Sequence, residues 1–520
     1  TEQDFENDGL VKCGMALGLY DKDAEGQAKF CAKAGFGLFF IFDQWREYDR
    51  EDNVLRPIDN ISVFQKYAEK ILFYITLTHI EYHFDMFPLP YPLSPVPAGA
   101  TRIPLDPAFE KYQDSFIKDY NGEIRYYGDR GRFCNPDPSL SFHKRLVEYI
   151  KDKYQKYPQL DGLAVDDVDF HPVDYGHPDP SGAYDFLPFA KPCLKAVINY
   201  KNIDKNKLLL IQSRVGAHKE VKYFNAGNAD YGDIYWDTRH SLPIKIMYGS
   251  KAFISINYPE FYLQMSLAKN DQEAVDQCTR ALNKCSLLWG FSVGSSMGLF
   301  YEQYKKGNLK PTLDFSRNIP VATRINSLRF IWDSDAAESS HSLYHNVFKD
   351  KEDKLFAITI KNEGDSALTD SISINKKILR INDNKRYVLG IWEYEYANSK
   401  FILEKFDNQL WTWGKDIKDI NVRINPDSVS TIWIAEYDGI NPVNIGFGII
   451  NPQERYYTEY VTTRIDDAKI GRNEVILSRQ KVSRVLKFVF FTETGEEKEI
   501  EITSEGGAID LGELRKKLSL

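Results

Sequence analysis

The segment LDGLAVDDVDF surrounds a short apolar run with carboxylates, residues that can act as nucleophiles, bases or proton donors. Asp161 precedes the run, and Asp166, Asp167 and Asp169 follow it. Because a carboxylate that is buried without a partner costs free energy, a buried strand that ends in clustered carboxylates indicates a functional site. We expect Asp166 to point inward at the strand tip and to act there, whereas Asp167 and Asp169 fit loop acids or caps.

Short apolar runs alternate with amphipathic helical stretches in the first part of the chain. The runs are residues 12–20, 36–43, 71–79, 161–167, 207–215, 233–238, 251–258 and 286–294. The clearest helical patterns are 141–154, 186–200 and 271–285, the last with Asp271 as its expected N-cap. Near-continuous apolar runs are typical of parallel strands that are buried on both faces. The pattern predicts an α/β fold, a (β/α)8 TIM barrel over residues 1–335, with a doubly wound open sheet as the alternative.

The chain changes character after residue 335. Apolar runs such as KLFAITIKN, STIWIAEY and VLKFVFFTE follow one another, separated by turns rich in Asn, Asp, Gly and Lys. Such runs with little helical pattern are typical of antiparallel strands. We expect a C-terminal all-β sandwich region over residues 336–520, and a further division into two subdomains near residue 440 stays open.

The composition argues against several classes of protein. The 520 residues are 43% hydrophobic with a net charge of −9, so the chain lacks the basic surface that is typical of nucleic-acid binding. No apolar run approaches the roughly 20 residues of a membrane span. The six cysteines form no CxxC pair, and we expect neither a metal nor a cofactor. The N-terminal stretch TEQDFENDGL lacks signal-peptide features, which favours the cytoplasm unless a leader was removed, and the oligomeric state is not predicted.

In a TIM barrel the catalytic residues lie at the C-terminal ends of the strands, where polar side chains converge. The predicted strand ends and the loops after them supply Asp43, Trp45, His79, Glu81, Asp166, Asp167, Arg214, Trp236, Asp237 and Glu260. Carboxylates on several strand ends fit glycoside hydrolysis, in which one carboxylate acts as nucleophile or base and another as acid. We expect Asp166 to be the nucleophile and Asp237 the second catalytic residue, with Glu260 as its alternative. The other residues of the set are candidates for binding the expected partner, an oligosaccharide or glycoside substrate.

The same motifs resemble those of TIM-barrel glycoside hydrolases, above all the α-galactosidase clan (glycoside hydrolase families 27 and 36). DGLAVDD (161–167) looks like the strand that ends in the catalytic aspartate, and it follows an NP turn and an amphipathic helix as in those barrels. FDQW (42–45) is similar to the Asp-Trp motif of α-galactosidases. The resemblance implies a barrel with a trailing β-sandwich and a retaining, exo-acting enzyme for α-linked sugars. It makes Asp166 the nucleophile and places the acid/base near the sixth strand, at Asp237. The clan has a Lys two residues before the nucleophile, where this chain has Ala164.

Two other functions stay open as alternatives. A non-catalytic carbohydrate-binding barrel is consistent with Ala164 in place of a basic residue. A metal-dependent hydrolase normally needs a His-x-His pair at the end of the first strand, and GLYDKD (18–23) contains none. The loop 169–180 contains two histidines and several aspartates, among them Asp174, and we interpret it as a substrate-facing loop rather than a metal site.

Overall fold

The computed structural model describes most of the secondary structure of the chain. The described residues are 14–19, 23–42, 61–68, 70–77, 79–81, 112–127, 131–166, 168, 174, 176, 191–213, 226–230, 241–242, 245, 252–256, 267–307, 313–331, 333–396, 399–404, 406, 411–437, 443–445, 448–451, 456–460, 469–470, 474–476, 484–491, 497–504 and 508–510.

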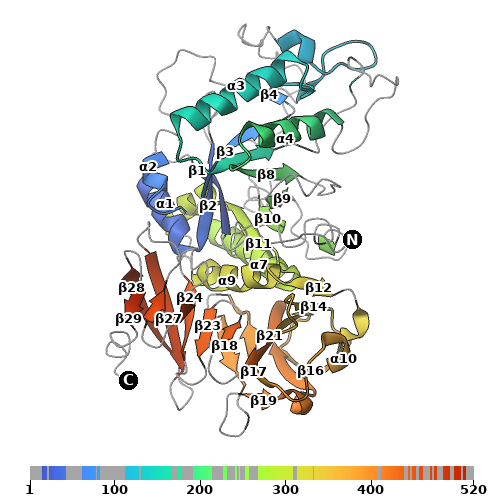
Figure 1. Ribbon diagram of the computed structural model, residues 1–520, viewed down its shortest axis with the longest axis vertical. Helices are drawn as coiled ribbons and strands as arrows, with labels where there is room; N and C mark the ends of the chain where they lie inside the picture. Colours follow the sequence, from blue (N-terminus) through green and yellow to red (C-terminus); the bar gives the residue numbers. More distant parts are fainter. Residues whose placement is uncertain are drawn as a thin grey trace.

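Parallel strands form a closed sheet in the first part of the chain (Figure 1). They are β1 (Gly14–Leu19), β2 (Phe36–Phe42), β3 (Lys70–Thr76), β7 (Gly162–Asp166), β8 (Leu208–Ser213), β9 (Ala226–Asp230), β10 (Ala252–Ile256) and β11 (Ser292–Ser296). Each strand pairs with the next in this order, and β11 pairs with β1 to close the sheet. The α/β class and the parallel sheet predicted from the apolar runs are confirmed.

Helices connect these strands, and α8 and α9 follow the last of them. The described ones are α1 (Ala24–Lys33), α2 (Ile61–Phe64), α3 (Ser141–Lys156), α4 (Lys191–Ile203), α7 (Asp271–Trp289), α8 (Met297–Lys305) and α9 (Leu313–Asn326). Most of the chain between β8 and β10 lies outside the described residues, so a complete set of strand–helix units stays a prediction. In α7 the N-cap is Asn270 rather than Asp271, because the Asn270 side chain accepts a hydrogen bond from Glu273 N (2.9 Å). Gly290 ends this helix with a φ of +62°, which glycine adopts readily.

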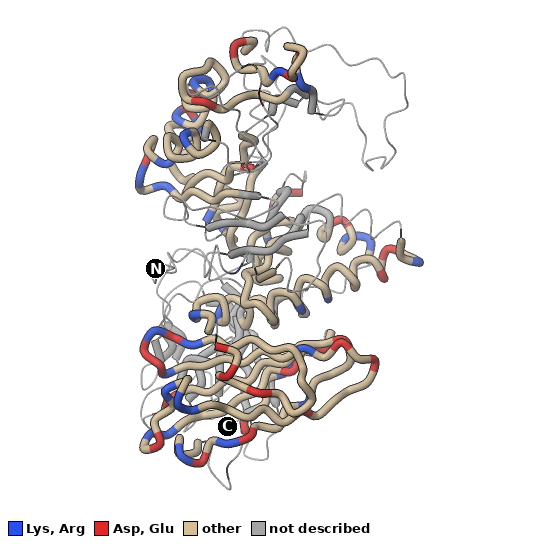
Figure 2. Tube along the Cα trace, turned by 90° about the vertical axis from the view of Figure 1, so that its right-hand side faces the viewer, with Lys and Arg blue, Asp and Glu red and all other residues tan. Residues whose placement is uncertain are grey.

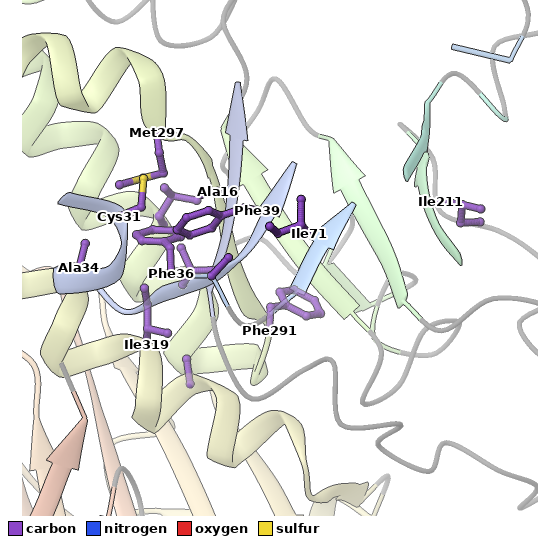
Figure 3. Close-up of a cluster of buried hydrophobic side chains, with 14 of the residues drawn as sticks. Ala16, Cys31, Ala34, Phe36, Phe39, Ile71, Ile211, Phe291, Met297 and Ile319 are labelled. Carbon is purple, nitrogen blue, oxygen red and sulfur yellow. The ribbon is translucent and has the colours of Figure 1, made fainter. Parts of the chain in front are cut away.

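The barrel strands divide their side chains between two cores, because successive residues of a strand point to opposite faces. In the outer core, strand residues such as Phe39 and Ile71 join helix residues such as Cys31 of α1 and Met297 of α8 (Figure 3). The inner core fills the barrel with Met15, Leu38, Phe40, Leu72, Ala164 and Leu210. Burial on both faces accounts for the near-continuous apolar runs of the sequence.

A small antiparallel sheet is inserted between β3 and α3. Its strands are β4 (His79–Glu81), β5 (Tyr126–Tyr127) and β6 (Gly131–Phe133), in the order β4-β6-β5. Because β3 ends at Thr76, the predicted strand 71–79 is too long, and His79 belongs to β4. The insertion therefore follows the C-terminal end of a barrel strand, on the side where a site is expected.

Two barrel strands differ from the prediction. The strand that pairs with both β8 and β10 is β9 (Ala226–Asp230), whereas the predicted strand 233–238 lies outside the described residues. The apolar run 286–294 is divided, since α7 continues to Trp289 and β11 begins at Ser292. The β9 segment AGNAD lacks the β-branched and aromatic residues that favour strands, so its place in the sheet overrides its propensity.

Antiparallel sheets form the rest of the chain. One sheet contains β12 (Arg329–Ile331), β14 (His345–Lys349), β15 (Leu355–Asn362), β17 (Arg386–Glu393), β18 (Lys400–Leu403), β19 (Thr412–Trp413) and β21 (Ser428–Tyr437). A second contains β13 (Ala337–Ser339), β16 (Leu368–Ile374) and β20 (Ile420–Ile424), and the helical turns η8 (Ser334–Ala336), α10 (Lys376–Leu379) and η9 (Gly414–Asp416) lie between strands. The two sheets share a buried core to which Ile358 of β15 and Val422 of β20 belong. The change to antiparallel β structure that the sequence predicts is confirmed.

Two more antiparallel sheets follow Tyr437. The first has the order β22-β23-β24-β27-β28, and the second has the order β25-β26-β29. Their strands are β22 (Val443–Ile445), β23 (Gly448–Asn451), β24 (Tyr456–Tyr460), β25 (Lys469–Ile470), β26 (Glu474–Ile476), β27 (Arg484–Phe491), β28 (Glu497–Ser504) and β29 (Ala508–Asp510).

The antiparallel sheets pack against the barrel through α7 and α9 (Figure 1). The Leu288 carbonyl at the end of α7 accepts hydrogen bonds from Thr359 Oγ1 (2.7 Å) and Asn346 Nδ2 (2.9 Å). Trp392 Nε1 of β17 donates to Asn318 Oδ1 of α9 (2.9 Å). These groups are buried, so the two parts of the molecule share a desolvated interface.

The surface carries charges of both signs. In Figure 2 acidic and basic residues are interspersed along the described part of the chain. None of the helices within the described ranges is long and apolar enough to cross a membrane.

Candidate active site

Asp166 is the last residue of β7 and lies at the C-terminal end of the barrel. Its side chain is partly exposed, whereas the rest of the strand is buried. Because Asp166 follows Ala164 of the inner core by two residues, its carboxylate faces the interior at the mouth of the barrel. Thr76 of β3 is its register partner, and Leu77 N donates to Asp166 O over 3.1 Å. The structure places Asp166 at the strand tip, and its catalytic role stays a prediction.

Tyr74 of β3 contacts this carboxylate. Tyr74 packs against the inner core, and its hydroxyl donates a hydrogen bond to Asp166 Oδ2. A hydrogen bond to a carboxylate favours its charged form. The arrangement therefore suits an ionised Asp166, which could act as a nucleophile or base. Sequence reasoning missed Tyr74, because it lies within the apolar run ILFYITLTH and only strand pairing brings it to Asp166.

Asp161 lies at the opposite end of β7 and stabilises the fold. Its carboxylate binds Lys70 Nζ (2.7 Å) and a backbone N–H of β3 (3.0 Å). Gly162 lies so close to β8 that a Cβ at this position would come within 2.1 Å of Leu208 O. The acids around the apolar run thus differ in position, with Asp161 just before the strand and Asp166 at its C-terminal end.

His79 and Glu81 lie in the insertion rather than at the end of β3. Both belong to β4, in which His79 pairs with Phe133 and Glu81 pairs with Gly131 of β6. The structure thus assigns them to an element that follows the barrel strand. Their part in binding a substrate stays a prediction.

Asp174 connects the loop after β7 to the insertion. It is buried, and it accepts hydrogen bonds from Asn135 Nδ2 (2.9 Å), Gly176 N (2.9 Å) and Lys118 N (3.3 Å). Asp174 thus links the loop to the insertion, and the substrate-facing role expected for the loop stays a prediction. Over the described parts of the chain, no group of three or more His, Cys, Asp or Glu residues could hold a metal ion.

The other predicted site residues lie outside the described residues. They are Asp43, Trp45, Asp167, Arg214, Trp236, Asp237 and Glu260. The position of β9 nevertheless changes the case for Asp237, which was expected near the end of a strand at 233–238. β9 ends at Asp230, well before that segment. Asp230 is thus a carboxylate at a strand end that sequence reasoning missed, and the acidic residue that closes AGNAD was the available signal.

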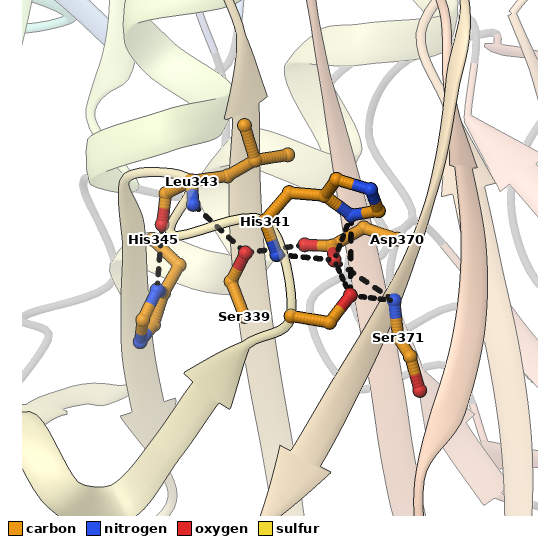
Figure 4. Close-up of polar contacts among 7 residues, drawn as sticks. Ser339, His341, Leu343, His345, Asp370 and Ser371 are labelled. Atoms are coloured by element: carbon orange, nitrogen blue, oxygen red, sulfur yellow. Dashed lines mark hydrogen bonds and ion pairs between the residues drawn. The ribbon is translucent and has the colours of Figure 1, made fainter.

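Serine, histidine and aspartate side chains form a hydrogen-bonded cluster in the C-terminal region (Figure 4). Asp370 accepts hydrogen bonds from Ser339 Oγ and Ser340 Oγ (both 2.5 Å). His341 Nδ1 lies 3.0 Å from Asp370 Oδ1 and 3.1 Å from Ser340 Oγ. In a catalytic triad the serine and the aspartate contact different ring nitrogens, whereas here both contact Nδ1. Burial acts to raise the pKa of Asp370, but these hydrogen bonds lower it overall, as expected for a structural carboxylate between β13 and β16.

Comparison with known proteins finds similarity only at the level of structure. No protein-family model and no curated protein sequence matches the chain. The structure is similar to α-galactosidases of glycoside hydrolase family 36, to a family 27 β-L-arabinopyranosidase and to an α-amylase, at low sequence identity.

One similar structure is a family 36 α-galactosidase from Geobacillus stearothermophilus in complex with raffinose. The two chains are 10% identical, the match covers 82% of this chain and 55% of that chain, and the TM-score is 0.49. This chain thus spans about half the length of that protein. A family 27 β-L-arabinopyranosidase from the same organism, in complex with arabinose, has 11% identity, coverage of 81% and 96%, and a TM-score of 0.45. A maltogenic α-amylase from Thermotoga neapolitana has 10% identity, coverage of 82% and 100%, and a TM-score of 0.45.

Proposed function

We propose that this protein is a glycoside hydrolase in which Asp166 is the catalytic nucleophile. The observation that supports the proposal is a partly exposed carboxylate at the inner C-terminal end of a parallel barrel strand, with a phenol hydroxyl donating to it. Active sites of parallel barrels lie at this end of the strands. The proposal includes a complete (β/α)8 barrel over residues 1–335 and a β-sandwich region over 336–520.

The proposed reaction is retaining and exo-acting on α-linked sugars. In the first step an Asp166 oxygen bonds to the anomeric carbon, while the glycosidic bond breaks and the leaving oxygen takes a proton from the acid. In the second step water attacks the anomeric carbon, gives a proton to the same acid/base residue and releases the Asp166 carboxylate. Asp237 is the proposed acid/base, and Glu260 is its alternative. The proposed substrate-binding residues are Asp43, Trp45, His79, Glu81, Asp167, Arg214, Trp236 and Glu260.

A second candidate function is carbohydrate binding without catalysis. Ala164 favours it, because the inner face of β7 offers no basic side chain next to Asp166. Such a protein would keep the polar mouth of the barrel and bind a sugar without cleaving it. The two candidates differ in one measurable property, turnover.

The test is release of p-nitrophenol from a panel of α- and β-aryl glycosides by the wild type, Asp166→Asn and Asp161→Asn. Asp161→Asn is the matched control, since it changes the same residue type at the other end of the strand. We expect one sugar to be cleaved and Asp166→Asn to lose roughly 10³-fold in kcat or more. Asp161→Asn should retain its kcat at a temperature at which it is folded. Full activity of Asp166→Asn would refute the assignment, and binding of a sugar without turnover by the wild type would favour the second candidate.

A further inference from the structure

The inner face of β3 next to Asp166 carries an aromatic residue, Tyr74, at the level of Ala164 of β7. Tyr74 is the register partner of Ala164, and Asp166 lies two residues further along β7. Side chains two residues apart on a strand share a face, so Ala164 and Asp166 both face the barrel interior beside Tyr74. The Tyr74 ring packs against the inner core that includes Ala164, and its hydroxyl reaches Asp166 Oδ2.

The Tyr74 ring packs in the barrel interior, to which Ala164 contributes only a methyl group. A tyrosine side chain is long enough to span from its own level to that of the next inward residue of a neighbouring strand. A long side chain at position 164 would occupy the same interior space, because residues 74 and 164 are direct neighbours in the sheet. Ala164 therefore leaves space for the phenol ring, and Tyr74 supplies the hydrogen-bond donor to Asp166.

We propose that Tyr74 is a positioning residue that holds the Asp166 carboxylate in its working orientation, and that Ala164 is small in order to admit it. This inference rests on the proposed function, since Asp166 is the nucleophile there. A hydroxyl that donates to one carboxylate oxygen fixes the plane of the group and stabilises its negative charge. Tyr74 need not touch the sugar to have this effect.

The experiment compares Tyr74→Phe with Tyr200→Phe in the full-length protein. Tyr200→Phe is the matched control, because it removes a buried hydroxyl that has no hydrogen-bond partner among the described residues. On the glycoside that the wild type cleaves, Tyr74→Phe should lower kcat roughly ten- to hundredfold and change KM less than about twofold. Tyr200→Phe should leave both values unchanged. A Tyr74→Phe enzyme with wild-type kcat would overturn the proposal.

A second measurement decides the contact without using activity. Tyr74→Phe should lower the melting temperature by roughly 2 °C in the wild-type background and by clearly less in Asp166→Ala, where its partner is missing. Tyr200→Phe should have the same effect in both backgrounds. Equal shifts for Tyr74→Phe in both backgrounds would overturn the positioning role. If the wild type cleaves no glycoside while the shifts differ, the proposed function fails and the Tyr74–Asp166 contact stands.

Ala164→Leu provides an independent check of the space that the ring needs. If the leucine side chain enters the space that the Tyr74 ring occupies, it should displace the phenol. Ala164→Leu should then lower kcat as Tyr74→Phe does. Combining the two substitutions should then cost no more than either one alone. Fully multiplicative losses would contradict the shared space.

Discussion

At the scale of single residues, a glycine at the beginning of β7 allows a close approach to β8. A Cβ on Gly162 would approach Leu208 O to 2.1 Å, so Gly162→Ala must push β7 away from β8. We expect this variant to lose about 1–3 kcal/mol in free energy of unfolding. Gly122→Ala is the comparison, because its surroundings are open and its φ of +82° costs alanine only about 1 kcal/mol. Thermal melting should show the larger loss for Gly162→Ala, and equal losses would contradict the close approach.

Residue by residue, the sequence identifies carboxylates better than it identifies their partners. Asp166 could be predicted at a strand tip, because polar residues that follow an apolar run are recognisable in the sequence. Tyr74 could not, since an aromatic residue within an apolar strand is compatible with ordinary packing until the register with Ala164 is known. Asp230 was missed for a different reason, because its strand was placed too far along the chain.

At the scale of elements, a buried lysine joins the ends of two helices. Lys245 Nζ donates to Gly290 O after α7 and to Asn326 Oδ1 at the end of α9, both over 3.0 Å. The ring centroids of Phe291 and Phe348 lie 5.8 and 5.6 Å from Nζ. Cations are favoured near helix C-termini, but burial lowers the pKa of Lys245 to about 7.

This depressed pKa predicts how stability depends on pH. Between about pH 7 and the ordinary lysine pKa of 10.5, the unfolded chain binds a proton at residue 245 that the folded protein lacks. This group therefore makes the protein more stable as the pH rises through that range, and below pH 7 its cost is constant. Melting temperatures at several values between pH 7 and 10 should rise less steeply for Lys245→Met than for the wild type. Parallel slopes would mean that Lys245 keeps its proton throughout.

Helices and strands differ in how far their boundaries could be predicted. The helix at 271–285 was found because caps and apolar periodicity agree, and its end moved only to Trp289. The sixth barrel strand was expected at 233–238, because DIYWDT has the stronger strand propensity. In the structure AGNAD (226–230) takes that position in the sheet. Whether a segment joins a parallel sheet depends on the strands that pair with it on both sides, and those strands are distant in the sequence.

At the scale of the whole molecule, the barrel and the antiparallel sheets are joined by buried hydrogen bonds that a pair of threonines can test. Thr359 of β15 and Thr431 of β21 are register partners, and both are fully buried. Thr359 Oγ1 donates to Leu288 O of α7 over 2.7 Å, whereas Thr431 Oγ1 has no hydrogen-bond partner within the described residues. The same substitution at the two positions therefore separates the hydrogen bond across the interface from the burial of a hydroxyl.

Thr359→Val should lower the free energy of unfolding by about 1 kcal/mol, since it removes one of the donors to the Leu288 carbonyl while Asn346 keeps the other. Thr431→Val should be neutral or stabilising, because it replaces an unsatisfied buried hydroxyl by a methyl group of the same shape. Calorimetry locates the effect, because a shared interface makes the two parts unfold together. Thr359→Val should then shift the whole transition, whereas a shift confined to one of two separate transitions would show that the barrel and the sheets unfold independently.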